Sequence, residues 1–453
     1  MFVLALRSLS GRASGFLASF LAMFLGAVIL MAFGSLFDTA GEPGLDPAAQ
    51  EMLTTLAAVV GGWGLILVTF AVTSTLGLSV RQRAAEMALL RNIGATPRQI
   101  TRMIVSEALV LALAAVFLAI VPARAVGRVL VAWLTGSGQI SGDVHHQFGG
   151  FAIHLGFGVT IAAALVAATV GARRTARMSA AASALDAATG EGRLSRKRIA
   201  AAGLLLFLGT DLAVVTATVM RGRDDFEPMA TAGPASIWFS AGLALLAPAL
   251  LRLTATRLTG LMERVGGVAG HLAGSNLAQR TAQLAPALMP VILFTGIATG
   301  TLYMLATDDA AGVAAGVVRT ADHQHAQTTN LVVIGMILTF AAIMVVNTMV
   351  ATTASRRREF GQHRLVGATS RQVLRMVAGE SAVLAATGVA FGTVAALVTV
   401  IPFSIARTGS IVPGGGPVPY LVVVVIAAAI ALAGSLTATR RALRVPAIEA
   451  VAA

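Results

Sequence analysis

The chain has 453 residues, of which 57% are hydrophobic and only 12% are charged. A soluble protein usually carries about 25% charged residues, so this composition indicates an integral membrane protein. No cysteine is present, which excludes disulfides, zinc–thiolate sites and cysteine nucleophiles. The net charge of +13 is typical of a membrane protein whose basic loops stay in the cytoplasm, and it calls for no nucleic-acid partner.

Ten apolar segments of about 20 residues each predict ten transmembrane helices. In chain order they lie near residues 15–37, 52–80, 104–122, 151–172, 200–220, 235–255, 286–306, 329–353, 378–401 and 418–438. The first is longer than the apolar core of a cleaved signal peptide, about 7–15 residues, so we expect it to remain in the membrane. Asp211 interrupts the fifth segment and Pro248 the sixth, which leaves the boundaries of these two open. The expected fold class is an all-α integral membrane protein.

Charge is divided between the two sets of loops. Basic residues gather at 81–102, 173–198, 252–280, 356–375 and 440–444, whereas acidic residues gather at 38–51, 224–227 and 308–322. Because Arg-rich short loops stay in the cytoplasm, the pattern predicts that both termini are cytoplasmic. An even number of helices agrees with this orientation.

One stretch of the chain occurs twice. "LLRNIGATPRQI" at residues 89–100 returns as "QHRLVGATSRQV" at residues 362–373, an offset of 273. We therefore expect a four-helix unit at 1–185, a cytoplasmic linker with two additional helices at 186–265, and a second four-helix unit at 266–453. Because an even number of helices separates the two units, they are parallel repeats in a 4+2+4 arrangement.

Each copy of the repeat predicts a helix, a sharp turn and a second helix that continues into the membrane. Gly94 and Gly367 suit the left-handed conformation that ends the first helix. The stretches Thr96–Gln99 and Thr369–Gln372 match the capping box that begins the second. Such an elbow either anchors the bundle at the membrane surface or docks a partner. Two copies with the same turn chemistry favour docking, to a partner that is itself two-fold symmetric.

The stretches "RQRAAEMALLRNIGATPRQITRMIVSEALVLAL" and "SRRREFGQHRLVGATSRQVLRMVAGESAVLAA" resemble the FtsX-like permease domain of the MacB and lipoprotein-releasing branch of ABC transporters. The resemblance covers both four-helix units but not the fifth and sixth helices. It implies that each elbow is a coupling helix that seats in a groove of a separate ATPase subunit, with two ATPase subunits for one chain. It also implies a multi-pass protein of the bacterial cytoplasmic membrane.

The resemblance further implies which residues couple to the ATPase, namely those that recur in both copies of the motif. They are Glu86, Arg91, Gly94, Ala95, Thr96, Arg98 and Gln99, and Glu359, Arg364, Gly367, Ala368, Thr369, Arg371 and Gln372. The chain itself contains no G-x-x-x-x-G-K-[ST] phosphate loop and no H-E-x-x-H or G-x-S-x-G hydrolase motif at a membrane face. We expect a non-catalytic subunit that binds no cofactor, with ATP and Mg²⁺ held by the partner.

The loops at 38–51 and 307–328 are too short to fold alone, whereas many relatives carry a large extracytoplasmic domain in these places. Short loops favour cargo taken from the membrane. The leading hypothesis is therefore an ABC transporter subunit that exports or extracts an antibiotic, peptide, lipid or lipoprotein. Two alternatives stay open, a mechanical signal transmitter that controls an envelope or lipoprotein partner, and a secondary transporter.

Three other features carry weaker signals. Asp211, in the fifth segment, is a candidate intramembrane polar site that contacts either cargo or a neighbouring threonine, unless the boundary of this helix lies elsewhere than expected. Glu107 and Glu380 lie near the starts of their helices, where we interpret them as stabilised by the helix dipole rather than as ATPase contacts. Two histidine-containing stretches suit either a metal ion or, as we favour, solvated polar loops: Asp143, His145 and His146, and Asp322, His323 and His325.

Overall fold

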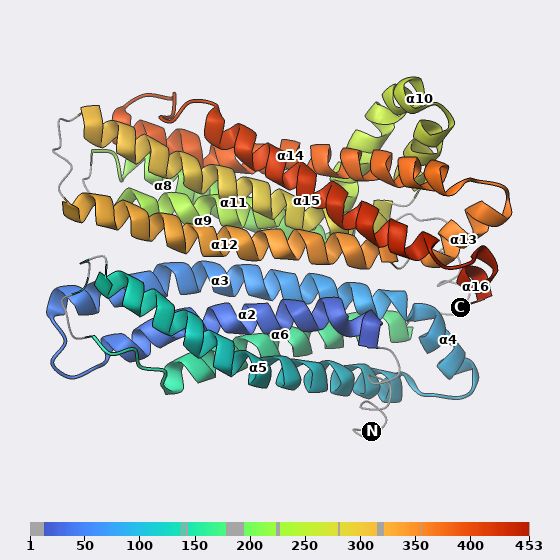
Figure 1. Cartoon of the computed structure of the whole chain (residues 1–453), viewed down its shortest axis with the longest axis horizontal. Helices are drawn as coiled ribbons and strands as arrows, with labels where there is room; N and C mark the ends of the chain where they lie inside the picture. The colour runs from blue at the N-terminus through green and yellow to red at the C-terminus, as the bar shows by residue number, and fades with distance from the viewer. Residues whose placement is uncertain are drawn as a thin grey trace. The chain divides into compact units, whose positions relative to one another are not determined.

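The computed structural model of the chain describes residues 13–136, 138, 140, 144–177, 194–222, 227–279, 281–314, 321–354 and 356–452. Every regular element in these residues is an α-helix (Figure 1). The prediction of an all-α fold is therefore confirmed for the described part of the chain. The chain divides into two compact units, one made of Met1–Leu185 with Arg319–Ile337 and the other of Asp186–Val318 with Leu338–Ala453.

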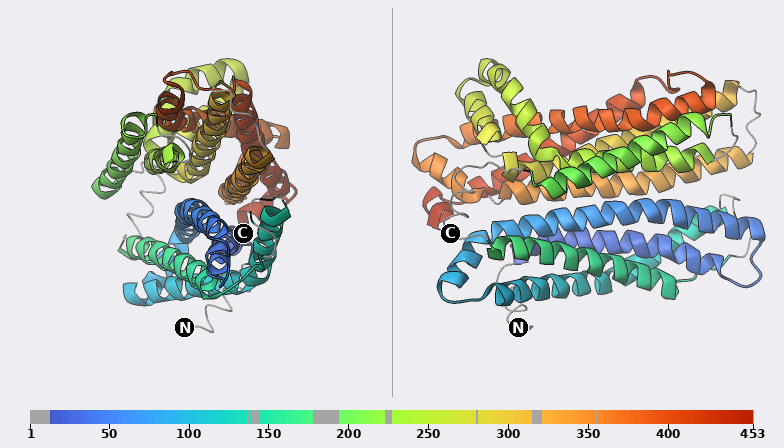
Figure 2. Two further views of the ribbon diagram at one scale, coloured as in Figure 1. Left: turned by 90° about the vertical axis from the view of Figure 1, so that its left-hand side faces the viewer. Right: turned by 180° about the vertical axis from the view of Figure 1, so that it is seen from behind.

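The first unit is built on four long helices and one short one. The long helices are α2 (Ala13–Ala40), α3 (Pro47–Gln82), α5 (Pro97–Gly136) and α6 (Gly150–Arg177), and the short helix α4 (Ala84–Asn92) joins α3 to α5. Helix α2 packs against α3, α5 and α6, and two further views show these helices running side by side (Figure 2). The short helix α4 and the long helix α5, which form the first copy of the repeat, therefore belong to one bundle.

Small residues allow these helices to approach closely. A Cβ atom added at Gly26 of α2 would lie 2.5 Å from Val68 of α3, and one added at Gly156 of α6 would lie 2.4 Å from Met31 of α2. Within a bilayer there is no hydrophobic force between helices, so close packing at small residues holds the bundle together.

The second unit centres on helix α14, which packs against α8, α9, α10, α11 and α15. Its helices are α8 (Arg196–Thr218), α9 (Glu227–Leu245), α10 (Ala247–Gln279), α11 (Thr281–Ala314), α13 (Arg357–Leu365), α14 (Ser370–Thr408), α15 (Val418–Leu443) and α16 (Ala447–Ala452). Helix α12 (Ala321–Ala354) contributes its later residues to this unit. The two additional helices predicted between the repeats thus pack on the second repeat.

The sixth predicted helix, 235–255, contains a sharp bend. Helices α9 and α10 meet at Leu246 with a bend of 69°. Pro248 accounts for the break, because it has no backbone N–H to donate and its ring clashes with the carbonyl four residues earlier. The segment expected to form one straight helix is therefore two helices that meet at an angle.

Seven of the described helices are long and apolar enough to cross a membrane, and the number is eight if the bent pair is counted as one span. They are α2, α5, α6, α8, α11, α14 and α15. The described parts of α3 and α12 hold shorter apolar stretches, Gly64–Gly77 and Ala341–Ala354. The chain is therefore a multi-pass membrane protein, while the full count of ten spans stays a prediction.

At the ends of the helices opposite the repeated motif, the loops are pinned to the helices. Asp38 of α2 accepts backbone N–H bonds from Gly149, Phe151 and Ala152 at 3.0, 3.1 and 2.9 Å, which caps the start of α6. In the second unit, Arg407 of α14 donates from Nε to Oδ1 of Asp308 in α11 at 2.8 Å. The bonds to Asp38 thus hold the segment before α6 against α2, and the Arg407–Asp308 pair joins α14 to α11.

Candidate functional site

The first copy of the repeated motif folds as a helix, a turn and a second helix. Helix α4 ends at Asn92, and Gly94 then adopts a φ of +99°. The Gly94 N–H donates to the Arg91 carbonyl at 3.0 Å, and the Ala95 N–H donates to the Leu90 carbonyl at 3.0 Å. These bonds satisfy the last carbonyls of α4 and turn the chain sharply into α5.

The second copy has the same geometry. Gly367 has a φ of +105°, its N–H donates to the Arg364 carbonyl at 3.1 Å, and the Ala368 N–H donates to the His363 carbonyl at 2.9 Å. The left-handed glycine predicted in each copy is thus confirmed. We call each short helix with its turn an elbow: residues 84–96 form the first elbow and residues 357–369 the second.

The capping boxes are also confirmed. The Thr96 N–H donates to Oε1 of Gln99 at 2.8 Å, and the Gln99 N–H donates back to Oγ1 of Thr96 at 3.3 Å. Thr369 and Gln372 make the same two bonds at the same distances. Each cap fixes the point at which the long helix begins, and so fixes where the elbow stands relative to that helix.

The end of each elbow exposes apolar side chains. Ile93 is 76% exposed and Val366 is 91% exposed, and these two residues correspond at the offset of 273. Leu89 and Leu365 are exposed as well. Arg98 and Arg371, in the first turn of the following helix, are exposed beside them. The structure therefore presents an apolar tip with an adjacent cation in both copies.

Not every residue predicted to couple faces outward. Arg364 donates from Nη1 to the carbonyls of Leu443 and Val445 at 3.2 and 2.8 Å, so it caps the end of α15 instead. Glu86 and Glu359 point toward the base of their elbows, where each pairs with an arginine. These three residues therefore make supporting contacts within the protein, although the side chain of Glu86 is still 42% exposed.

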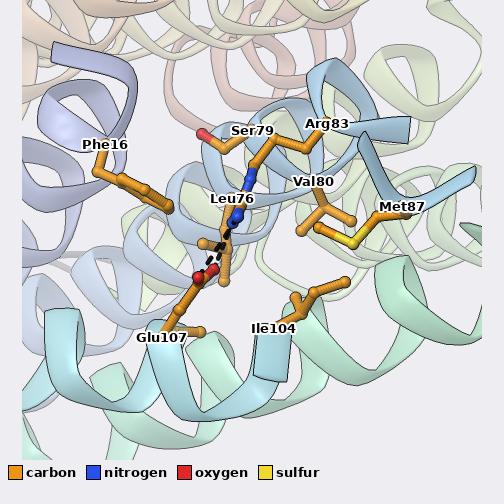
Figure 3. Close-up of a pocket in the computed structure, with 9 residues that line it drawn as sticks. Phe16, Leu76, Ser79, Val80, Arg83, Met87, Ile104 and Glu107 are labelled. Carbon is orange, nitrogen blue, oxygen red and sulfur yellow. Dashed lines mark hydrogen bonds and ion pairs between the residues drawn. The ribbon is translucent and has the colours of Figure 1, made fainter. Parts of the chain in front are cut away.

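The arginine at the base of the first elbow is Arg83, the single residue between α3 and α4. Its guanidinium makes a two-pronged ion pair with Glu107 of α5, in which Nη1 contacts Oε2 and Nη2 donates to Oε1 at 3.3 Å (Figure 3). Its Nε also lies 3.4 Å from Oε2 of Glu86 in α4. The Glu107 residue is only 1% exposed. The Phe16 ring covers the guanidinium, with 5.4 Å from Cζ to the ring centroid.

The second elbow repeats this arrangement with Arg356, Glu359 and Glu380. The Arg356 guanidinium pairs with Glu380 through Nη1–Oε2 and through Nη2–Oε1 at 3.1 Å. It also donates to Glu359 from Nε at 3.1 Å and from Nη2 at 2.9 Å. The Glu380 residue is 1% exposed, and it accepts a further bond from Nδ2 of Asn276 at 2.8 Å. We call each set of one arginine and two glutamates a triad.

The arginine of each triad is held in its charged form. Burial alone would lower the pKa of Arg83, but the hydrogen bonds and charges of Glu107 and Glu86 outweigh it and raise the pKa above its ordinary value. Burial would likewise lower the pKa of Arg356. The charges and hydrogen bonds of Glu380 and Glu359 outweigh this effect, so the pKa of Arg356 is also raised. Each guanidinium therefore stays protonated beside its carboxylates.

The helix-dipole interpretation of Glu107 and Glu380 is wrong. Glu107 lies ten residues beyond Pro97, the first residue of α5, and dipole effects fade within the first turn. The two glutamates are buried acids paired with Arg83 and Arg356 instead. The sequence carried a signal for this pairing, because each arginine precedes its glutamate by 24 residues in both copies.

The histidine stretches give no metal site among the described residues. His146 bonds through Nε2 to Oγ of Ser35 at 2.9 Å, and burial together with Arg128 and Arg124 lowers its pKa. Asp143 lies outside the described residues, as do the side chains of Asp322, His323 and His325.

Asp211 lies on the exposed face of α8, in line with the exposed side chains of Leu204, Phe207 and Val214. The neighbouring Thr210 donates its hydroxyl to the Leu206 carbonyl at 2.8 Å rather than to Asp211. Among the residues that the structure describes, no side chain pairs with the Asp211 carboxylate. The helix is one of the candidate spans, so this carboxylate stands on an apolar face.

Comparison with known proteins gives one family. The model of the FtsX-like permease C-terminal domain matches residues 58–180 and 331–447, together more than half of the chain. Each matched segment contains one complete elbow and its triad. No curated protein matches the chain.

Proposed function

This chain belongs to the FtsX-like permease family, and from that premise we propose that it is the membrane subunit of an ABC transporter driven by a separate ATPase. Members of this family are typically non-catalytic membrane subunits that work with ABC ATPases. ATP and Mg²⁺ would be held by the ATPase, and this chain would convert hydrolysis into movement of its helices. The protein would lie in the cytoplasmic membrane of a bacterium with both termini in the cytoplasm.

The observation that carries this proposal is the pair of elbows with exposed tips. Exposed apolar side chains such as Ile93 and Val366 cost free energy in water unless a partner covers them. Both tips have the same turn, the same cap and an adjacent arginine, Arg98 or Arg371. Two equal tips in one chain suit two equal grooves, and a dimer of ATPase subunits offers such a pair.

The residues predicted to couple fall into two roles under this proposal. The outer role belongs to the turn, the cap and the adjacent arginine, which would contact the ATPase. It comprises Gly94, Ala95, Thr96, Arg98 and Gln99 with their counterparts Gly367, Ala368, Thr369, Arg371 and Gln372. The inner role belongs to Glu86, Glu359 and Arg364, which hold the elbow in place. Arg91 is half-buried on the first elbow, and we assign it to neither role.

The cargo would be amphipathic and would reach the protein from the membrane. The short loops at 38–51 and 307–328 offer no separate domain to receive a soluble cargo. Asp211 would then face the lipid, where an unpaired carboxylate is unfavourable. We propose that it contacts a cationic group of the cargo, as in a basic peptide or an aminated antibiotic.

The test is co-purification of this chain with the ATPase encoded beside its gene, followed by measurement of ATP hydrolysis in nanodiscs. We expect a stable complex whose hydrolysis exceeds that of the ATPase alone. The variants Ile93→Asp and Val366→Asp should lower both binding and stimulation, whereas Ile199→Asp, at another exposed apolar position, should not. Unchanged binding in the double variant would refute docking at the tips. Cargo flux into vesicles would separate transport from signalling alone.

A further inference from the structure

We propose that Arg83 and Arg356 are positioning residues that brace each elbow against the long helix that follows it. Each triad would make the elbow and that helix move as one body. The use of this brace in transport rests on the proposed function, but the brace itself is a property of the permease alone.

The first triad connects three separate elements. Arg83 follows α3 directly, Glu86 lies in the first turn of α4, and Glu107 lies well inside α5. The side chain of Arg83 makes no capping bond to α4 and extends across to α5 instead. The ion pair therefore closes a loop of 24 residues that contains the whole elbow.

A second contact in each elbow supplies the pivot for this brace. Met87 of α4 and Phe360 of α13 correspond at the offset of 273, and both are 1% exposed. Met87 lines the same small pocket as Arg83, Ile104 and Glu107 (Figure 3). Among the described side chains of α4, Met87 is the one that is buried, so α4 has few other contacts to fix its angle. The second elbow has further supports, because Gly361 lies against Ala450 and Val451 of α16. A two-pronged ion pair is directional, so it fixes the angle at which the elbow stands.

Burial makes this connection strong in a way that a surface ion pair is not. Exposed ion pairs contribute little, because water and salt screen them. Glu107 and Glu380 are buried, so loss of their arginine partner would leave an uncompensated charge in an apolar site. A force applied at Ile93 or Val366 is thus passed to α5 or α14 rather than absorbed by the turn at the glycine.

The brace can be measured with pairs of spin labels, because the chain has no cysteine of its own. One pair uses Ile93→Cys with Val121→Cys, and the other uses the corresponding exposed positions Val366→Cys and Val394→Cys. Distances are recorded by double electron–electron resonance on the permease alone in nanodiscs. Both pairs should give a single narrow distribution.

The two triads then serve as controls for each other. Glu107→Gln should broaden the distribution of the first pair only, and Glu380→Gln that of the second pair only. The exposed arginines Arg102 and Arg375 correspond at the same offset, and their replacement by Gln should change neither distribution. A narrow distribution in both glutamate variants would overturn the brace.

A second variant, which leaves no unpaired charge, distinguishes loss of the ion pair from misfolding. Arg83→Met combined with Glu107→Leu removes the ion pair and leaves an apolar contact, which buried sites tolerate well. It should fold, as judged by its melting temperature, and should still broaden the first distribution. A narrow distribution in this folded variant would equally overturn the brace.

The functional arm uses the ATPase complex. With both glutamates replaced by Gln, the ATPase should still co-purify, because the tips are unchanged, but the permease should no longer stimulate hydrolysis. Full stimulation together with broad distance distributions would overturn the transmission of force through the brace. If the unaltered permease binds no ATPase at all, the proposed function fails. The distance measurements would still show whether the ion pairs fix the angles of the elbows.

Discussion

Replacement of Gly94 and Gly367 by valine tests whether the turn presents the docking tip. These glycines have φ values of +99° and +105°, and a Cβ atom at either would meet nothing within 4 Å. The cost therefore comes from the backbone alone, about 1–2 kcal/mol for a branched residue in the left-handed region. Such a cost shifts the balance between the native turn and other conformers by about 5- to 30-fold. It is too small to unfold the bundle.

The assay is the affinity of the ATPase for the permease in nanodiscs, with stimulated hydrolysis measured in parallel. If only the native turn binds, each valine should weaken affinity, by at most the factor of its conformational shift. Because each elbow is proposed to bind its own ATPase subunit, the free-energy costs should add in the double variant.

Two controls make this result specific. Asparagine tolerates positive φ better than valine, so Gly94→Asn should lose less affinity than Gly94→Val. Gly158 lies within α6 with open space around its Cα and no positive φ, so Gly158→Val should bind normally. The reasoning is refuted if the double valine variant binds and stimulates like the unaltered protein. The elbow would then be a membrane anchor only.

Three further predictions concern orientation, the tips and the cargo. A cysteine that replaces Ser195 should resist an impermeant thiol reagent in intact cells, whereas one that replaces Asp225 should react. Asp225 lies outside the described residues. The reverse pattern of labelling would overturn the topology. Ile93→Asp and Val366→Asp should each cost more than about 1 kcal/mol of ATPase binding, as isothermal titration would show, because central apolar contacts dominate interfaces. Asp211→Asn should leave the melting temperature unchanged or higher while lowering cargo-stimulated hydrolysis, and unchanged stimulation would remove Asp211 from the cargo site.

Sequence reasoning succeeded where structure is set by local chemistry. The left-handed glycines and the capping boxes depend on residues within a few positions of each other, so the pattern around Gly94 and Gly367 was sufficient to predict them. The all-α membrane fold followed from long apolar segments, which leave the backbone few alternatives in lipid.

Sequence reasoning failed where distant residues meet. Arg83 and Glu107 are 24 residues apart and come together only because the elbow folds back, so the acid was assigned to a dipole effect instead. The bonds from Arg364 to the carbonyls of Leu443 and Val445 likewise join residues 79 and 81 positions apart, which no local pattern predicts.

The central claim is that one chain docks two ATPase subunits through its two elbows. Native mass spectrometry of the complex, purified in mild detergent with the ATPase encoded beside the gene, tests this claim most directly. The account predicts a mass equal to one permease of 46.1 kDa and two ATPase subunits. It also predicts that Gly367→Val shifts the population toward a single ATPase subunit or none. A complex of two permease chains with two ATPase subunits, or a permease that binds no ATPase, would contradict it.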